Sequence, residues 1–375
     1  MQVRLFCVLV TVRIFTYDGG MKLSVIVPVL NEIDQLPAFL RMLAGQQGLE
    51  FELIIVDGGS SDGSTSFVSE SSAEYPGPLC LVESAPGRGR QLNTGAARAA
   101  SDLLLFLHID TVFNDALTLA RAVDEYRTVI DNSPDRCVAA HFRLQFQRAN
   151  QESAFGYYFW EAKARLDRPE CTHGDQGFLM TRELFDKVGP FDVDVPIAED
   201  TRLAERVRAL GAWHLLSSSL CTSARRFENE GLQQRQTLNA LIMNFAAIGW
   251  NDFFSQARDV YRQQSETGGL DLVPFFALID RLNRQSSLLQ RLTRWYRTGI
   301  YVRPNAWQLA FLKDIKRNFK DAVPVDDITL PALEFHDRWF ELLTDNLFGR
   351  LVAMGGTWIW YRLTVWRYRT GKLHP

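Results

Sequence analysis

The amino-acid sequence predicts an α/β fold, in which a mostly parallel sheet with helices on both faces is followed by a helical C-terminal extension. Two observations indicate this class. Between residues 21 and 110, short apolar runs alternate with amphipathic segments, which is typical of right-handed β-α-β units. Beyond residue 231, helical periodicity replaces this alternation.

Four apolar runs are expected to form the parallel strands. Each run is short and bounded by polar or turn residues, as a buried strand should be. The runs cover residues 23–29, 53–56, 79–82 and 103–107. Helices are expected between them, over residues 36–43, 64–71 and 90–100.

The pattern changes after residue 110. Glu199 opens an amphipathic helix that Gly211 ends, with Leu203, Val207 and Leu210 on one face. The remaining elements are a strand over 138–146, an aromatic-rich helix over 153–166, a strand or turn over 174–181, and helices over 238–254, 273–295 and 347–369.

These patterns divide the chain into residues 1–20, 21–231 and 232–375. The apolar stretch at residues 5–12 lacks a signal-peptide cleavage site after it and falls short of the about 20 apolar residues that a bilayer span requires. A strand-like sequence begins afresh at Met21, so residues 1–20 are interpreted as a translated leader outside the fold. The alternative interpretation is a membrane-surface anchor.

Composition excludes several classes of protein. The chain has 375 residues, of which 46% are hydrophobic and 23% charged, as in an ordinary globular protein. A net charge of −3 gives no electrostatic footprint for nucleic acid. The five cysteines are scattered and form no C-x-x-C pair, which favours free thiols in a reducing cytoplasm over a disulfide framework or a zinc site.

The most informative segment is LLLFLHIDT, residues 103–111. His108 and Asp110 are two residues apart at the end of an apolar run, so on an extended chain they point the same way and can converge on one metal ion or phosphate. Open α/β sheets bind their ligands at the carboxyl ends of such strands. In the alternative interpretation, Asp110 caps a helix that begins near Asn114.

Three other motifs would indicate nucleotide binding or catalysis. The first strand is followed by no glycine, so the G-x-G-x-x-G of a dinucleotide-binding fold is missing, and the chain contains no P-loop. Residues 59–63 match G-x-S-x-G, the nucleophile elbow of hydrolases. No glycine-rich oxyanion segment accompanies Ser61, and the loop equally reads as a turn in which Asp62 caps the next helix.

Six motifs in order resemble glycosyltransferase family 2, the inverting GT-A type. They are SVIVPVLNE (24–32), IIVDGGSSDGS (54–64), GRGRQLNTGA (87–96), FLHIDT (106–111), GDQGF (174–178) and EDTRLAERVRALG (199–211). RGRQLN, GDQ and the histidine in place of the first Asp of D-x-D are similar to the subgroup described as radical-SAM/selenodomain-associated transferases. The resemblance runs from Met21 to Gly231.

This resemblance implies a site for a nucleotide-sugar donor, with UDP as the expected nucleotide. Asp57 is similar to the family carboxylate that accepts the uracil ring N–H, although a turn residue is its simpler interpretation. Arg88 and Arg90 offer guanidinium groups to the diphosphate or hold the nucleoside, and Asn93 is expected to order their loop. The other residues expected at the donor are Pro28, Asn31 and Glu32, which is also a plausible helix-start acid, together with Asp175 and Gln176 near the sugar or acceptor.

The resemblance also implies a metal ion and a base. Asp110 matches the second acid of D-x-D, which holds Mg²⁺ or Mn²⁺ against the phosphates. His108 departs from that pattern and suits Mn²⁺ better than Mg²⁺, or it contacts the sugar instead. Asp200 matches the catalytic base that deprotonates the acceptor hydroxyl, with Glu199 as the second candidate. The simpler interpretation of Asp200 is a carboxylate that caps its helix.

Beyond Gly231 the resemblance fades. The final predicted helix mixes tryptophans with arginines, but the uncharged run between Arg350 and Arg362 is too short to cross a membrane. Tryptophan and arginine favour the headgroup level of a bilayer, so a peripheral contact at the inner face of the membrane is one interpretation. The other is that these helices cover the transferase domain or form a dimer contact.

The sequence therefore predicts a cytoplasmic glycosyltransferase that moves a sugar from a nucleotide sugar to an acceptor hydroxyl with inversion. The sugar, the acceptor and the oligomeric state stay open. Two alternatives of other classes also stay open: a nucleotidyltransferase of related fold, and a catalytically silent protein that binds nucleotide sugars.

Overall fold

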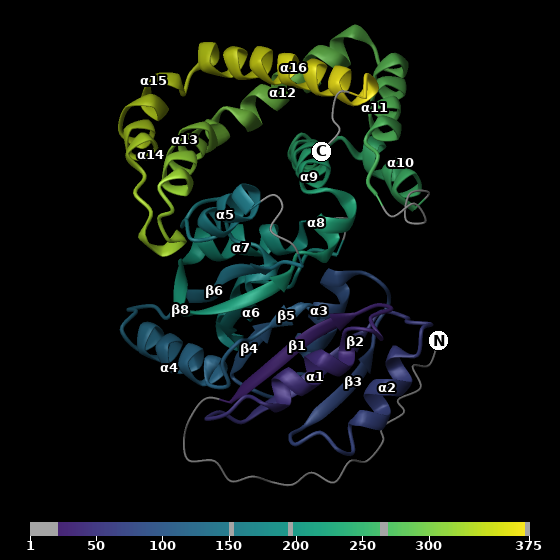
Figure 1. The fold of residues 1–375 in the computed structure, drawn as a ribbon, viewed down its shortest axis with the longest axis vertical. Helices are drawn as coiled ribbons and strands as arrows, with labels where there is room; N and C mark the ends of the chain where they lie inside the picture. Colours follow the sequence, from purple (N-terminus) through teal and green to yellow (C-terminus); the bar gives the residue numbers. More distant parts are fainter. Residues whose placement is uncertain (1–21, 150–153, 194–197, 263–268, 372–375) are drawn as a thin grey trace.

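A computed structural model describes residues 22–149, 154–193, 198–262 and 269–371 (Figure 1). The predicted leader and the start at Met21 lie outside these residues. The described part consists of an α/β domain and a set of helices that covers one end of it, where Figure 1 shows α9, α12 and α16.

The sheet has eight strands in the order β3-β2-β1-β4-β7-β6-β8-β5 within the described residues. The first four, β1 (Leu23–Val29), β2 (Phe51–Asp57), β3 (Leu79–Glu83) and β4 (Leu103–Phe106), are parallel and correspond to the four predicted strands. The others are β5 (Thr111–Val112), β6 (Val138–Gln147), β7 (Phe178–Thr181) and β8 (Ala212–Ser223). β7 is antiparallel to β4 and β6, β5 is antiparallel to β8, and β6 and β8 are parallel. The predicted α/β class with a mostly parallel sheet is confirmed.

Helices cover both faces of this sheet because successive side chains of each strand point to opposite faces. Val25 and Val27 belong to one hydrophobic cluster and Ile26 to the other. The first cluster also includes residues of α1 (Leu36–Ala44), α2 (Ser64–Ser71) and α4 (Thr118–Asp131). The second includes residues of α3 (Arg88–Arg98), α6 (Arg182–Val188) and α7 (Glu199–Leu210).

The C-terminal helices differ from the predicted ones in number. The predicted helix over 238–254 is divided between α9 (Leu232–Ala247) and α10 (Asn251–Arg262), with Gly249 at φ +71° between them. The predicted helix over 273–295 is divided between α11 (Val273–Gln285) and α12 (Leu288–Val302), because the Ser287 side chain accepts from Gln290 N and caps a new helix. By contrast, α16 (Leu347–Arg369) has the predicted bounds.

The remaining elements connect these helices to the α/β domain. They are α5 (Ala154–Lys163), α8 (Arg225–Glu230), α13 (Trp307–Lys320), α14 (Pro331–Phe335), α15 (Glu341–Thr344), the short 3-10 turns η1 (Gly174–Gln176), η2 (Pro304–Ala306) and η3 (Val325–Asp327), and the π-helical turn η4 (His336–Phe340). None of the helices in the described ranges has the length and apolar character that a membrane span requires.

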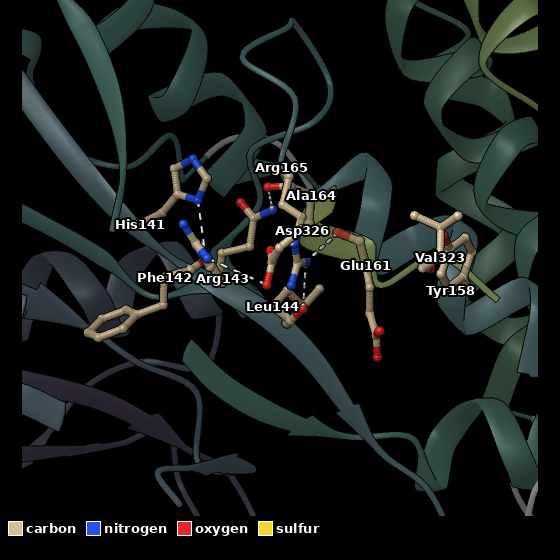
Figure 2. A network of polar contacts seen from close by, with 11 residues as sticks. His141, Phe142, Arg143, Leu144, Tyr158, Glu161, Ala164, Arg165, Val323 and Asp326 are labelled. Carbon is tan, nitrogen blue, oxygen red and sulfur yellow. Dashed lines mark hydrogen bonds and ion pairs between the residues drawn. The ribbon is translucent and has the colours of Figure 1, made fainter. Parts of the chain in front are cut away.

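The C-terminal part is attached to the α/β domain by apolar and polar contacts. One hydrophobic cluster joins Ala162 of α5 to Trp307 and Phe311 of α13. Figure 2 shows the polar contacts next to it, in which Arg165 Nε donates to Asp326 Oδ1 at 2.6 Å and Arg165 Nη1 donates to the backbone oxygen of Leu144 at 3.0 Å. This attachment fixes η3 against β6 and α5.

Candidate active site

A cavity of about 2020 Å³ lies between the carboxyl ends of β1 and β4 and the C-terminal helices. One wall comes from the loops after these strands and from the first turns of α3 and α7, and the opposite wall comes from α9, α12 and α16. Among the predicted site residues, Pro28, Glu32, Arg88, Arg90, His108, Asp110, Asp175, Gln176, Glu199 and Asp200 line the cavity, whereas Asn31, Asp57 and Asn93 do not. The carboxyl-end position is where open α/β sheets bind ligands.

Asp57 is the last residue of β2, and its two carboxylate oxygens differ in hydrogen bonding. Its Oδ2 accepts from Gly59 N at 2.8 Å and from Ser60 N at 3.0 Å, which forms the turn of the simpler interpretation. Its Oδ1 is buried and has no hydrogen-bond partner among the described residues. The side chain is 3% exposed. A buried acceptor without a donor is costly, so this oxygen is suited to an N–H group of a ligand.

The loop after β1 is bound to the loop after β2 through Asn31. This residue has φ 55°, its N–H donates to Ser60 Oγ at 2.8 Å, and its Oδ1 accepts from Ser61 N at 2.8 Å. Asp62 accepts from Ile33 N and from Ser64, as expected of a turn residue. Among the described residues, the hydrogen bonds of the histidine rings do not include Ser61. The loop therefore has turn chemistry.

Helix α3 contributes two kinds of polar residue. Arg88 lines the cavity and lies 3.5 Å from Glu199 Oε1. Asn93 points elsewhere: its Nδ2 donates to Phe191 O and its Oδ1 accepts from Phe191 N, both at 2.8 Å. Gln91, which the sequence interpretation did not single out, is 4% exposed and donates through Nε2 to Val29 O and Val56 O, both at 2.8 Å. It thereby holds the ends of β1 and β2 together.

His108 and Asp110 follow β4 and both face the cavity. Burial, with the Arg88 guanidinium acting in the same direction, lowers the pKa of His108 to about 4, so the imidazole is neutral at neutral pH. Thr222 Oγ1 of β8 donates to Asp110 Oδ2 at 3.1 Å. Within the described ranges, no group of three or more His, Cys, Asp or Glu side chains gathers as a metal cluster.

Asp200 lies in the first turn of α7 and accepts from two backbone N–H groups. Gly174 N donates to its Oδ2 at 2.8 Å and Thr201 N donates to its Oδ1 at 2.7 Å. Burial acts to raise its pKa, but His173, the Gly174 N–H and Arg88 together lower the pKa below its ordinary value. A Cβ added at Gly174 would lie 3.0 Å from His108 Nε2 and 3.2 Å from Asp200 Oδ2, so the glycine allows both side chains to approach η1.

Asp175 is the next residue of η1 and has a different environment. Its Oδ1 is buried without a hydrogen-bond partner in the described structure. Burial, followed by the nearby Asp200 and Asp110 carboxyls, raises its pKa from 3.8 to about 7. Gln176, in contrast, uses its amide internally: Nε2 donates to Cys171 O at 3.0 Å and Oε1 accepts from His173 N at 3.0 Å. Two buried carboxyls with opposite pKa shifts therefore lie side by side on one wall.

The pKa of Asp175 predicts a pH-dependent effect of Asp175→Asn on stability. A raised folded-state pKa means that the folded chain keeps its proton while the unfolded chain loses it, so the wild type loses stability as pH rises from about 4 to about 7. Asparagine has no proton to lose. Relative to wild type, the free energy of unfolding of the variant should therefore rise by about 2 to 4 kcal/mol across that pH range.

Chemical denaturation in EDTA at pH 4.5 and 7.5 measures this difference. His108 titrates in both proteins, so the comparison isolates Asp175. An equivalent Glu183→Gln change in the exposed first turn of α6 should show no such trend. If the difference in unfolding free energy between Asp175→Asn and wild type does not change with pH, the pKa of Asp175 lies near its ordinary value.

The fold and the site together define an α/β protein whose cavity has a polar wall at the carboxyl ends of parallel strands. Residues 24–189 match the family described as Glycosyl transferase family 2. Over these residues the chain is similar to glycosyltransferase family 2. The narrower subgroup suggested by RGRQLN and GDQ stays a prediction.

Similar proteins include several glycosyltransferases. The chain is 28% identical over 179 residues to a PGL/p-HBAD biosynthesis glycosyltransferase of Mycobacterium bovis, which covers 47% of this chain and 66% of that relative. It is 33% identical over 113 residues to an uncharacterized glycosyltransferase of Haemophilus influenzae, which covers 30% and 36%. Among solved structures, the mannosyltransferase PcManGT from Pyrobaculum calidifontis, in complex with GDP-Man and Mn²⁺, is 19% identical with a TM-score of 0.44 and covers 91% of this chain and 87% of that one. The chain thus spans slightly under two thirds of the Mycobacterium relative's length.

Proposed function

We propose that this chain transfers a sugar from a nucleotide sugar of the UDP type to an acceptor hydroxyl, with inversion at the anomeric carbon. The observation that supports this most is the cavity wall on which Arg88, His108 and Asp110 meet the buried carboxyls of Asp175 and Asp200. Cationic and metal-ligating groups suit a departing diphosphate, and a buried carboxylate suits deprotonation of a hydroxyl. Among the described residues, this wall of the cavity combines both kinds of group.

The nucleoside end of the donor is assigned to the loops after β1 and β2. Asp57 Oδ1 is the proposed acceptor for the uracil ring N–H, with Pro28, Asn31 and Glu32 around the nucleoside. Asn31 supports this indirectly, since it binds the two loops to each other. Arg88 and Arg90 are the proposed diphosphate contacts because they begin α3 at the cavity.

Asp57→Asn should weaken UDP binding by about 1 to 3 kcal/mol, because an amide NH₂ then faces the base N–H in place of a free acceptor. Asparagine keeps one oxygen for the Gly59 and Ser60 N–H groups, so the turn should persist. Isothermal calorimetry measures the difference. Asp62→Asn is the control, since Asp62 lies in the same loop and bonds only within the two loops. Equal UDP affinity of Asp57→Asn and wild type would contradict the assignment.

The residues present fit a divalent ion, Mn²⁺ or Mg²⁺. The neutral His108 ring has a nitrogen lone pair available, and Asp110 offers a carboxyl oxygen from the same strand end. Two protein ligands suit an ion that shares its remaining positions with phosphate oxygens, and an imidazole favours Mn²⁺. When bound, such an ion neutralises charge on the departing diphosphate.

The proposed base is Asp200, with Glu199 as the second candidate. Asp200 Oδ1 accepts from the Thr201 N–H and, at 3.4 Å, from the Thr201 hydroxyl, whereas Oδ2 accepts only the Gly174 N–H among the described residues and keeps a lone pair for the acceptor proton. Its lowered pKa keeps it ionised and ready to accept. Asp175 and Gln176 are assigned to the sugar or acceptor side of the cavity, because η1 lies between His108 and Asp200. The inverting stereochemistry is proposed from the resemblance to the inverting GT-A type.

A screen of nucleotide sugars for thermal stabilisation with Mn²⁺ identifies the donor, and product analysis then identifies the reaction. Transfer releases free nucleoside diphosphate as the acceptor is glycosylated. A nucleotidyltransferase would release pyrophosphate instead, and a silent binding protein would be stabilised but would release nothing. Either of the last two outcomes would overturn the proposal.

We also propose the arrangement of the chain and its place in the cell. Gly231, with φ +84° between α8 and α9, is the proposed end of the transferase domain, and residues 232–375 form the extension. The scattered cysteines favour the cytoplasm, and the arginines and tryptophans of α16 favour a peripheral contact with the inner face of the membrane.

A further inference from the structure

The cavity is larger than a nucleotide sugar requires and has two chemically different walls. Ligand pockets commonly measure about 300 to 1,000 Å³, whereas this one measures about 2020 Å³. The wall from the α/β domain carries the polar groups described above. The opposite wall is mainly apolar and includes Phe245, Trp250, Trp295, Phe348, Val352 and Trp360. A ligand that fills both halves has a polar end and an apolar end.

The apolar wall continues to the outside of the molecule. Leu343 and Phe348 line the cavity and are also 73% and 76% exposed, so they border its mouth. Val352 lines the cavity and is 57% exposed. Beyond this border, the surface of α12 and α16 is apolar: Leu288, Leu289, Leu292, Leu351, Ile359 and Leu363 are each at least 42% exposed. Large exposed apolar patches mark an interaction site.

The charge of these two helices indicates what they contact. Helix α12 has three arginines, α16 has four, and neither has an Asp or Glu, although the whole chain has a net charge of −3. Arg350 pairs with Asp345 and Arg369 with Asp280. For Arg291, Arg362 and Arg367, no ion pair is seen among the described residues. Arg362 also lies over the Trp358 ring, at 6.0 Å from its centroid. Apolar residues mixed with arginines that have no carboxylate partner among the described residues match an anionic lipid surface.

The two helices form one continuous surface. They run antiparallel, because Gly299 of α12 lies against Arg350 and Met354 while Trp295 packs on Tyr361. Figure 1 shows α16 along the edge of the molecule opposite β1 to β3. A second copy of the chain placed symmetrically on this surface would bring arginines against arginines, which disfavours a dimer there.

We infer that the acceptor is an amphiphile taken from an anionic bilayer. Helices α12 and α16 rest on the lipid surface, the apolar chain of the acceptor enters along the apolar wall, and its hydroxyl reaches Asp200. This inference rests on the proposed function, because it places the acceptor on the wall opposite the donor.

The first test fills the apolar half of the cavity. Gly355 and Gly356 both have open space where a Cβ would lie, but only Gly356 lines the cavity. Gly356→Phe should weaken binding of a dansyl-labelled fatty acid, used below its micelle concentration, by about tenfold or more, because the ring occupies the space of the chain. Gly355→Phe makes the same change one position away and should bind the probe as wild type does. Equal probe affinity in both variants would overturn the inference.

The second test uses sedimentation with vesicles of phosphatidylcholine, with and without phosphatidylglycerol. Wild type should bind the anionic vesicles, and Leu292→Asp/Leu363→Asp should lose about tenfold or more in binding. The matched control is Leu117→Asp/Leu210→Asp, which alters two leucines of the α/β domain that are 44% and 43% exposed. The inference would be overturned if wild type did not sediment with the anionic vesicles. It would also be overturned if the control lost as much vesicle binding as Leu292→Asp/Leu363→Asp. UDP-sugar binding by thermal shift, measured on all variants, is expected to be unchanged. Its absence in wild type would instead contradict the proposed function.

Discussion

Asp200→Asn is expected to slow single-turnover transfer by about 10² to 10⁴ while UDP-sugar affinity persists. Asparagine keeps the size of the side chain but cannot take the acceptor proton. It also presents an NH₂ to one of the two backbone N–H groups that Asp200 now binds, from Gly174 or Thr201. The measurements are donor affinity with Mn²⁺ and single-turnover transfer to the identified acceptor.

Two controls separate a base from a helix cap. Glu199→Gln, at the neighbouring position, should transfer within about tenfold of wild type if Asp200 is the base. Melting temperature reports what Asp200 contributes to the stability of the first turn of α7, where Ala198 is the N-cap residue and Asp200 accepts from Thr201 N. If Asp200→Asn transfers at near the wild-type rate, Asp200 is a capping acid and Glu199 takes its role.

Asp110→Asn is expected to weaken Mn²⁺-dependent donor binding and to lower turnover as well, each by about tenfold or more. The reason is that a carboxylate ligand of the metal would stabilise the diphosphate in both the ground state and the transition state. This double loss distinguishes Asp110 from Asp200, whose substitution should affect turnover alone. Calorimetry with and without Mn²⁺, followed by transfer assays, measures both quantities.

Asp115→Asn serves as the matched control, because Asp115 is an exposed carboxylate five positions along that accepts from Leu117 N and pairs with Arg121. It should leave donor binding unchanged. Normal Mn²⁺-dependent donor binding by Asp110→Asn would contradict the assignment of Asp110 as a metal ligand. A loss that is equal with and without Mn²⁺ would assign Asp110 a direct contact with the donor.

The strands were predictable where the hydrophobic pattern was uninterrupted. β1 and β4 are buried on both faces, so their sequences are apolar apart from Ser24. β8 was not predicted, because Ser217, Ser218 and Ser219 interrupt its apolar residues at the register shift opposite His141 and Arg143. Its pairing with β6 holds it in the sheet. A pairing between segments so far apart in the chain cannot be recognised from the local sequence.

The same contrast applies to the site. His108 and Asp110 reach one cavity because they follow a strand whose carboxyl end the topology fixes. The structure shows that Asn93 and Gln176 bond to backbone groups of Phe191, Cys171 and His173, which spacing along the chain does not reveal. Spacing does not reveal the role of Gln91 either, although this residue lies within the RGRQLN motif that carries the resemblance. Thus motif position predicted which loops meet, and contacts decided what each residue does.

The apolar cluster shared by α5 and α13 makes the two parts of the chain one cooperative unit. Ala162 is fully buried in the cluster that contains Trp307 and Phe311, and Arg165 donates to Asp326 of the distant segment. A chain cut at Gly231 would leave this apolar surface in water and an arginine without its partner. Thermal unfolding should therefore proceed as a single calorimetric transition. A chain without the extension would need polar residues in place of the apolar ones that α5 now buries against α13.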